Sequence, residues 1–188
     1  MKTKILVAVL ANFLVVGAAS ADQFLTKADE RNNIVSPGAP EVFAGGDTCA
    51  TAPNINALPF SDSGTTVGAT NTVAALQAGC SDYTAVNGPD QIYTFTTTAG
   101  ASVAITLTPT TATYDPAIYV LSTCGTGTTC VTGSDSTLGG AAETINAFAF
   151  APGTYGLYVD SFYAAGAGCG GQGGALCGDG AYDISVTG

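Results

Sequence analysis

The stretches QIYTFTTT (Gln91–Thr98) and SVAITLT (Ser102–Thr108) decide the fold class. In both, large apolar side chains alternate with small or hydroxyl-bearing ones. A period of two is typical of β-strands that bury one face. Ala99-Gly100 lies between the two stretches, so we expect them to form a hairpin.

The same pattern of short strands and turns continues along the chain. Further strands are expected at Ala117–Leu121, Glu143–Phe150, Thr154–Asp160 and Ala181–Thr187. No segment shows a helical period of apolar residues with caps at both ends. The sequence therefore predicts an all-β protein, an antiparallel β-sandwich at residues 47–188. Residues 22–46 contain two Pro and no strand pattern, and are expected to form an N-terminal arm or linker.

Residues 1–21 have the pattern of a secretory signal peptide. Lys2 and Lys4 precede an apolar stretch from Ile5 to Val16, and Ala19-Ser20-Ala21 is a cleavage site of small residues. The apolar stretch is shorter than the ~20 residues that a membrane-spanning helix needs. We therefore predict a mature protein that begins at Asp22, is secreted or held at the cell surface, and has no membrane span after cleavage.

Charge is distributed unevenly along the chain. The 188 residues include 14 acidic and 4 basic residues and no His, a formal net charge of −10. No Lys or Arg follows residue 31, so every later carboxylate must be solvated, hydrogen-bonded or bound to a metal ion. Four basic residues cannot coat a phosphate backbone, which excludes nucleic acid as a partner. The lack of His excludes Ser-His-Asp triads and His-ligated zinc.

The six Cys residues indicate three disulfide bonds, because an even number of Cys behind a signal peptide is typical of an oxidising compartment. They are Cys49, Cys80, Cys124, Cys130, Cys169 and Cys177. Sequence alone allows 15 pairings. Cys124 and Cys130, like Cys169 and Cys177, are close in sequence and flank Gly-rich stretches that can turn sharply. We expect these two pairs, which leaves Cys49 to pair with Cys80.

Short motifs follow one another in a distinctive order from residue 47 onward. They are Asp47-Thr48-Cys49, Leu58-Pro59-Phe60, Ser63-Gly64-Thr65-Thr66, Gly68-Ala69-Thr70-Asn71, Gly88-Pro89-Asp90-Gln91-Ile92-Tyr93-Thr94-Phe95, Tyr114-Asp115-Pro116-Ala117-Ile118-Tyr119-Val120, Ala151-Pro152-Gly153-Thr154-Tyr155 and Tyr158-Val159-Asp160. This order resembles the bacterial pre-peptidase C-terminal (PPC) domain family. The resemblance implies a secreted β-sandwich with a jelly-roll-like arrangement, which acts as an accessory module without catalytic activity of its own.

The chain departs from the PPC pattern in two places. Ser161 follows Asp160, where the family usually has Gly. The stretch from Ala164 to Gly180 is rich in Gly, contains two Cys, and looks like an insertion.

Four aspartates are candidate calcium ligands, namely Asp115, Asp135, Asp160 and Asp179. They lie at strand ends or in loops rich in Gly or Ser, and no basic residue is available to neutralise them. Calcium prefers six to eight oxygen ligands and needs no nitrogen ligand. There is no EF-hand-like loop, so a site would assemble from separate loops. The alternative is that these residues are ordinary turn residues and that calcium is not a cofactor.

Aromatic residues suggest a second kind of site. Phe162 and Tyr163 open the Gly-rich stretch and are candidate ligand-binding residues, whereas most other Tyr and Phe residues are expected to fill the core. The chain has no Trp, the residue that stacks best on sugars. Asp90, which follows Gly88-Pro89, is expected to accept hydrogen bonds from backbone N–H groups and so to fix the start of the next strand.

These observations favour a secreted, non-catalytic module that binds an extracellular protein or polysaccharide. The alternative is a structural subunit of an extracellular fibre or surface layer. Such a subunit would self-assemble when the arm of one copy adds a strand to the free sheet edge of another. An enzyme is not predicted, because the chain has only three Glu residues and the domain is small for a substrate cleft. A cluster of carboxylates in one cleft is the feature that an enzyme would need.

Overall fold

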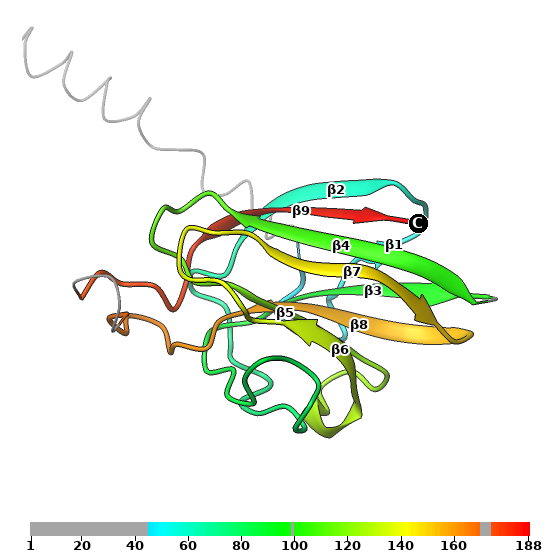
Figure 1. Cartoon of the computed structure of the whole chain (residues 1–188), viewed down its shortest axis with the longest axis horizontal. Helices are drawn as coiled ribbons and strands as arrows, with labels where there is room; N and C mark the ends of the chain where they lie inside the picture. Colours follow the sequence, from blue (N-terminus) through cyan, green and yellow to red (C-terminus); the bar gives the residue numbers. More distant parts are fainter. Residues whose placement is uncertain (1–44, 99, 170–173) are drawn as a thin grey trace, which may run out of the picture. The chain divides into compact units, whose positions relative to one another are not determined.

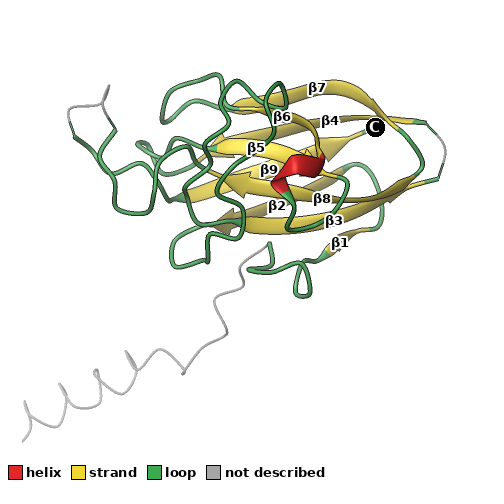
Figure 2. Ribbon diagram, turned by 90° about the horizontal axis from the view of Figure 1, so that it is seen from below, coloured by secondary structure: helices red, strands yellow, loops and turns green. Residues whose placement is uncertain are grey.

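The computed structural model describes residues 45–98, 100–169 and 174–188, which include nine strands in two sheets (Figures 1 and 2). The predicted signal peptide and all but the last two residues of the predicted arm lie outside the described residues. Within the described part of the chain, no helix is long and apolar enough to cross a membrane.

The first sheet has five strands. In spatial order they are β1 (Asn54–Ile55), β3 (Gln91–Thr97), β8 (Gly153–Asp160), β5 (Ala117–Leu121) and β6 (Cys130–Ser134). All neighbours are antiparallel except β1 and β3, which run parallel. A short 3₁₀ helix, Gly127–Thr129, leads directly into β6.

The second sheet has four strands and lies against the first. Its spatial order is β2 (Phe60–Thr65), β9 (Ala181–Thr187), β4 (Ala101–Pro109) and β7 (Glu143–Phe150), and all three pairings are antiparallel. Apolar side chains from both sheets fill the space between them. The predicted all-β, antiparallel sandwich is therefore confirmed.

The predicted hairpin of the two opening stretches is wrong. β3 pairs with β8 in the five-stranded sheet, whereas β4 pairs with β7 and β9 in the four-stranded sheet. The chain crosses from one sheet to the other between them. Tyr93 and Phe95 of β3 share one buried cluster with Val103 and Ile105 of β4. Alternation identifies the buried face of each strand, but it does not say which strand pairs with which.

The centre of the five-stranded sheet, β5 and most of β8, is buried on both faces. Its outer face is covered by residues 66–90, the covering loop, whose apolar side chains include Val73 and Val86. They pack with Tyr119 and Tyr158, whose rings stack with centroids 5.0 Å apart and planes 10° from parallel. This explains why β5 is apolar throughout, since all five of its residues are buried.

Two of the three predicted disulfide pairings are wrong. The structure pairs Cys49 with Cys124, Cys80 with Cys130 and Cys169 with Cys177, at Cα–Cα distances of 5.9, 5.8 and 5.9 Å. Only the last agrees with the expectation. Cys80 belongs to the covering loop and Cys130 begins β6, so this bond fastens the loop to the sheet. Proximity in sequence misled the prediction, because long-range packing of the covering loop decides which Cys residues meet.

Candidate functional site

A pocket of about 300 Å³ opens at one end of the five-stranded sheet. It is lined by Tyr83, Asp115, Asp135, Ser136, Thr137, Leu138, Phe162 and Tyr163. The antiparallel pairing of three strands places these segments together. The start of β5 lies beside the ends of both β6 and β8, since Ala117 pairs with Asp160 and Ile118 with Ser134. Residues just before β5 and just after β6 and β8 therefore meet, and the covering loop adds Tyr83.

Asp115 enters the pocket from the segment that precedes β5. Its backbone N–H donates a hydrogen bond to the carbonyl oxygen of Cys177, at 3.0 Å. The loop closed by the Cys169–Cys177 disulfide thus holds Asp115 in place. The side chain is 6% exposed.

Asp135 is positioned by a turn that is built around a buried glutamate. Glu143, the first residue of β7, is fully buried and accepts hydrogen bonds from the backbone N–H groups of Ser136 and Thr137, at 3.0 and 2.6 Å. The hydroxyl groups of Ser134 and Thr137 also donate to it, at 2.5 and 2.6 Å. Glu143 therefore clamps residues 134–137. The sequence analysis missed this role, although a Ser- and Thr-rich turn followed by a glutamate was a usable signal.

Two carboxylate oxygens of the pocket residues are buried without a hydrogen-bond partner in the structure. They are Oδ1 of Asp115 and Oδ2 of Asp135, and Asp135 is only 3% exposed. A buried acceptor left unpaired costs about 1–3 kcal/mol, so such groups are uncommon in folded proteins. These two oxygens are available to a ligand that brings hydrogen-bond donors.

The electrostatics of the pocket are strongly negative. Burial, together with the charges of Glu143, Asp115 and Asp82, raises the pKa of Asp135 to about 7. Burial and then the charge of Glu143 also raise the pKa of Asp115 above its ordinary value. No Lys or Arg occurs among the described residues, so no internal cation relieves this repulsion. A positively charged ligand would do so.

The aromatic wall of the pocket consists of Tyr83, Phe162 and Tyr163. The rings of Tyr83 and Phe162 meet edge to face with centroids 5.3 Å apart, and those of Phe162 and Tyr163 do so at 5.1 Å. Asn87 fixes this wall, because its side-chain amide donates to the carbonyl oxygen of Phe162 at 2.9 Å. Tyr83 is 55% exposed, so part of the wall faces solvent.

Asp160 lies apart from the pocket. It is fully buried beneath the covering loop, where its Oδ1 accepts from the N–H of Ser161 at 2.6 Å and its Oδ2 from the hydroxyl of Tyr119 at 2.8 Å. Burial and the adjacent Asp90 raise the pKa of Asp160 well above its ordinary value. Both of its oxygens therefore already have partners.

Asp90 has the structural role that the sequence predicts. Its Oδ2 accepts hydrogen bonds from the backbone N–H groups of Thr72 and Val73, at 2.5 and 3.0 Å. The hydroxyl of Thr72 donates to the same oxygen at 2.5 Å. Asp90 thus fixes the start of the covering loop against the start of β3.

The structure brings together two of the four predicted calcium ligands. Asp115 and Asp135 line the pocket, but Asp160 does not, and Asp179 is a half-buried residue that is also absent from the lining. Within the described ranges, no group of three or more His, Cys, Asp or Glu residues is arranged to hold a metal ion. Calcium binding stays a prediction. Phe162 and Tyr163, predicted separately as ligand-binding residues, lie in the same pocket as the two aspartates.

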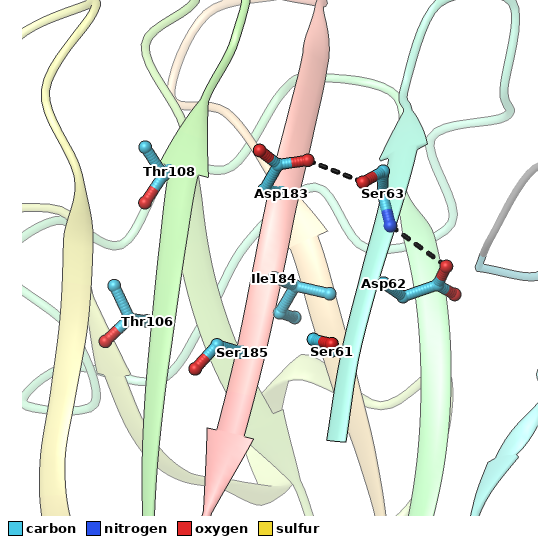
Figure 3. Close-up of a pocket in the computed structure, with 8 residues that line it drawn as sticks. All are labelled: Ser61, Asp62, Ser63, Thr106, Thr108, Asp183, Ile184 and Ser185. Atoms are coloured by element: carbon cyan, nitrogen blue, oxygen red, sulfur yellow. Dashed lines mark hydrogen bonds between the residues drawn. The ribbon is translucent and has the colours of Figure 1, made fainter. Parts of the chain in front are cut away.

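A larger and shallower pocket of about 730 Å³ lies over strands β2, β9 and β4 (Figure 3). Its lining is Ser61, Asp62, Ser63, Thr106, Thr108, Asp183, Ile184 and Ser185. Here the acidic groups already have partners. The Ser63 hydroxyl donates to Asp183 at 2.6 Å, and the Ser63 N–H donates to Asp62 at 2.9 Å. This surface has the character of an ordinary solvated sheet face.

No family model matches the chain, and no curated protein matches it. Solved structures similar to it include the pre-peptidase C-terminal domain of a collagenase from Bacillus anthracis. That domain is 16% identical, and the match covers 69% of this chain and 90% of that one with a TM-score of 0.40. A PPC domain is thus among the solved structures that are similar to this chain.

Proposed function

We propose that this protein is a secreted, non-catalytic module, and that it binds an extracellular protein or polysaccharide through the pocket at the start of β5. One observation carries the proposal. An aromatic wall that is partly open to solvent adjoins two buried carboxyl groups, each with an oxygen that lacks a hydrogen-bond partner. Pockets with apolar walls and a few convergent polar groups are the usual form of ligand sites.

The energetic cost of the pocket supports a binding role. Two unpaired buried acceptors and clustered negative charges both destabilise the folded state. A solvated turn at this edge of the sheet would avoid both costs. A ligand that donates hydrogen bonds would pair the two acceptors, and a cationic ligand would also reduce the repulsion between the negative charges.

The composition supports a non-catalytic role. The chain has no His, and all six Cys residues form disulfides, so the common nucleophile–base pairs do not exist here. The three disulfides also fit an oxidising, extracellular location.

The sheet edges favour a binding module over a fibre subunit. β1 has only two residues, and β6 and β7 each pair with their neighbour through a register shift. β2, at the edge of the second sheet, carries the charged residue Asp62, which lines the solvated pocket over that sheet. Short strands, bulges and charged side chains on edge strands all discourage pairing between sheet edges.

The proposal is tested by retention of the mature protein, residues 22–188, on a panel of ligands. The panel comprises native gels cast with hydroxyethyl cellulose or alginate, and columns carrying an immobilised basic or acidic protein. We expect retention on at least one member, and a loss of at least tenfold in the double variant Tyr83→Ala, Phe162→Ala. Val67→Ala is the matched control, because Val67 is 52% exposed and lies outside the pocket. Retention that survives the double variant contradicts the proposal.

A further inference from the structure

We propose that the pocket receives a basic side chain, lysine or arginine, from a partner protein. The cationic head would lie between Asp115 and Asp135, and the aliphatic stem would lie against the aromatic wall. This inference rests on the proposed function, since it names the chemistry that the same pocket recognises.

The acceptors in the pocket match the donors of a basic side chain. Glu143 is fully occupied by its clamp of donors, and Asp82 accepts from the backbone N–H of Asp135 at 3.3 Å. Oδ1 of Asp115 and Oδ2 of Asp135 therefore remain as acceptors without donors. An ammonium group carries three donors and a guanidinium five, and neither carries an acceptor. A sugar hydroxyl donates as well, but it leaves the negative charge of the cluster unrelieved.

The aromatic wall matches the rest of such a side chain. The faces of Tyr and Phe rings attract cations, and the methylene stems of lysine and arginine pack along apolar surfaces. The edge-to-face arrangement turns neighbouring rings in different directions, with interplanar angles of 63° for Tyr83–Phe162 and 78° for Phe162–Tyr163. A volume of about 300 Å³ is at the small end for ligand sites, which suits one side chain better than an extended ligand.

An organic cation fits the pocket better than a metal ion. Calcium takes six to eight oxygen ligands, mostly from carboxylates and carbonyls. The described part of the chain offers no group of three or more acidic side chains at metal-binding separations. The rim of the pocket also includes Leu138, which is 70% exposed and gives an apolar contact for residues beside the basic one. A net negative chain would in addition attract a basic protein from a distance.

The test compares two synthetic peptides of equal length, acetyl-(Gly-Lys-Gly)₅-amide and acetyl-(Gly-Gln-Gly)₅-amide, by calorimetric titration at fixed ionic strength. We expect the lysine peptide to bind at least tenfold more tightly. Asp135→Asn should weaken its binding at least tenfold, and Phe162→Leu, which keeps an apolar side chain but removes the ring, at least threefold. Asp183→Asn is the matched control, because it makes the same change in net charge on an exposed residue outside the pocket. Asp183→Asn should change the affinity for the lysine peptide by less than twofold.

Several results would overturn the inference. One is equal binding of the two peptides, and another is an equal loss in Asp135→Asn and Asp183→Asn. Tighter binding of a chitosan oligomer than of the lysine peptide would assign the pocket to an amino sugar. A rise in melting temperature with CaCl₂ beyond that with NaCl at matched ionic strength, lost in Asp135→Asn, would assign it to calcium. A melting curve of each variant shows that it is folded before binding is compared.

Failure of the inference is distinguishable from failure of the proposed function. If the lysine peptide does not bind, but retention on the polymer and protein panel still depends on Tyr83 and Phe162, only the inference is wrong. If retention is also independent of those residues, the pocket is not the binding site.

Discussion

At the scale of single residues, buried acidic groups fulfil different roles in this protein. Glu143 accepts hydrogen bonds from several donors. Asp160 lies beside Asp90, the last residue of the covering loop, and Asp115 and Asp135 each keep an unpaired oxygen. The sequence set Asp90 apart as a structural residue, but it grouped Asp160 with Asp115 and Asp135 and gave Glu143 no role. All five are carboxyl groups beside strands, and only packing decides which of them receive donors.

Glu143 is predicted to be the most sensitive of these residues. Glu143→Ala removes the acceptor of several charge-assisted hydrogen bonds and leaves buried N–H groups unpaired, so we expect a loss of about 3 kcal/mol or more in the free energy of unfolding. Glu143→Gln keeps one carbonyl acceptor and should cost about 1–2 kcal/mol. Urea unfolding measures both. Equal losses of unfolding free energy in the two variants would contradict the role of Glu143 as the hydrogen-bond acceptor that holds residues 134–137.

Stability is predicted to fall as the pH rises from 5 to 8. An unfolded Asp titrates near pH 3.9, whereas the pKa of Asp160 is raised well above that value and that of Asp135 to about 7. In this window the folded protein retains protons that the unfolded chain releases, so the free energy of unfolding decreases with pH. Asp135 alone, with a folded pKa of about 7, gives a loss of about 2–3 kcal/mol between pH 5 and 8, measured by urea unfolding at both pH values.

Asp160→Asn tests the origin of this pH dependence. Asparagine resembles the protonated acid, so the variant should show a flatter profile between pH 5 and 8 than the native protein. Asp183→Asn makes the same change in net charge on an exposed residue and serves as the matched control. A profile that is equally steep in the native protein and in Asp160→Asn would show that other groups are responsible.

At the scale of elements, strands with strong patterns were predictable, whereas three of the four edge strands were not. β5, β7 and β9 have the predicted boundaries. The pattern is clearest in β5, which is continuously apolar, and in β9, where buried and exposed residues alternate strictly. β1, β2 and β6 were missed. β1 has two residues, and the sequences of β2 and β6, FSDSGT and CVTGS, contain Gly and few apolar residues. Edge strands bury less apolar surface, so their sequences show less of the alternation between apolar and polar residues.

The disulfides are predicted to differ in what they stabilise. In the chain-entropy relation, Cys80–Cys130, with a sequence separation of 50, contributes about 4 kcal/mol, and Cys169–Cys177, with a separation of 8, about 2.5 kcal/mol. Replacing the first pair by Ala should therefore cost more stability in urea. Replacing the second should weaken ligand binding more, since its loop holds Asp115.

Peptide mapping without reduction provides the control for this comparison. Cys124 and Cys130 lie on one chymotryptic fragment, because no Phe, Tyr or Leu separates them, so the fragments that contain Cys49 and Cys80 should both be linked to it. A Cys49 fragment linked to the Cys80 fragment alone, with the fragment of Cys124 and Cys130 linked to neither, would contradict the structure and restore the pairing expected from sequence proximity.

At the scale of the whole molecule, the candidate site arises from topology more than from any local motif. Asp115, Asp135, Phe162 and Tyr163 were each singled out in the sequence, but their proximity follows from the antiparallel pairing of β5 with β6 and β8. Tyr83 was missed, because the covering loop has no periodicity that would reveal which of its side chains reach the pocket.

The mature protein is predicted to be a monomer in solution. Each sheet edge carries a feature that hinders pairing with another chain, and negative charge keeps copies apart. Sedimentation equilibrium at micromolar concentration should give a mass somewhat below the 18.5 kDa of the full chain. Concentration-dependent growth to large species would instead favour the fibre subunit.

The stacked rings of Tyr119 and Tyr158 beneath the covering loop have a spectroscopic consequence. The chain has no Trp, so tyrosine dominates its near-ultraviolet absorption. Two parallel rings 5.0 Å apart couple their transitions, and this coupling depends on their geometry. Near-ultraviolet circular dichroism should therefore report the state of the covering loop. If the loop opens before the sandwich unfolds, that signal will change while the far-ultraviolet signal of the strands persists.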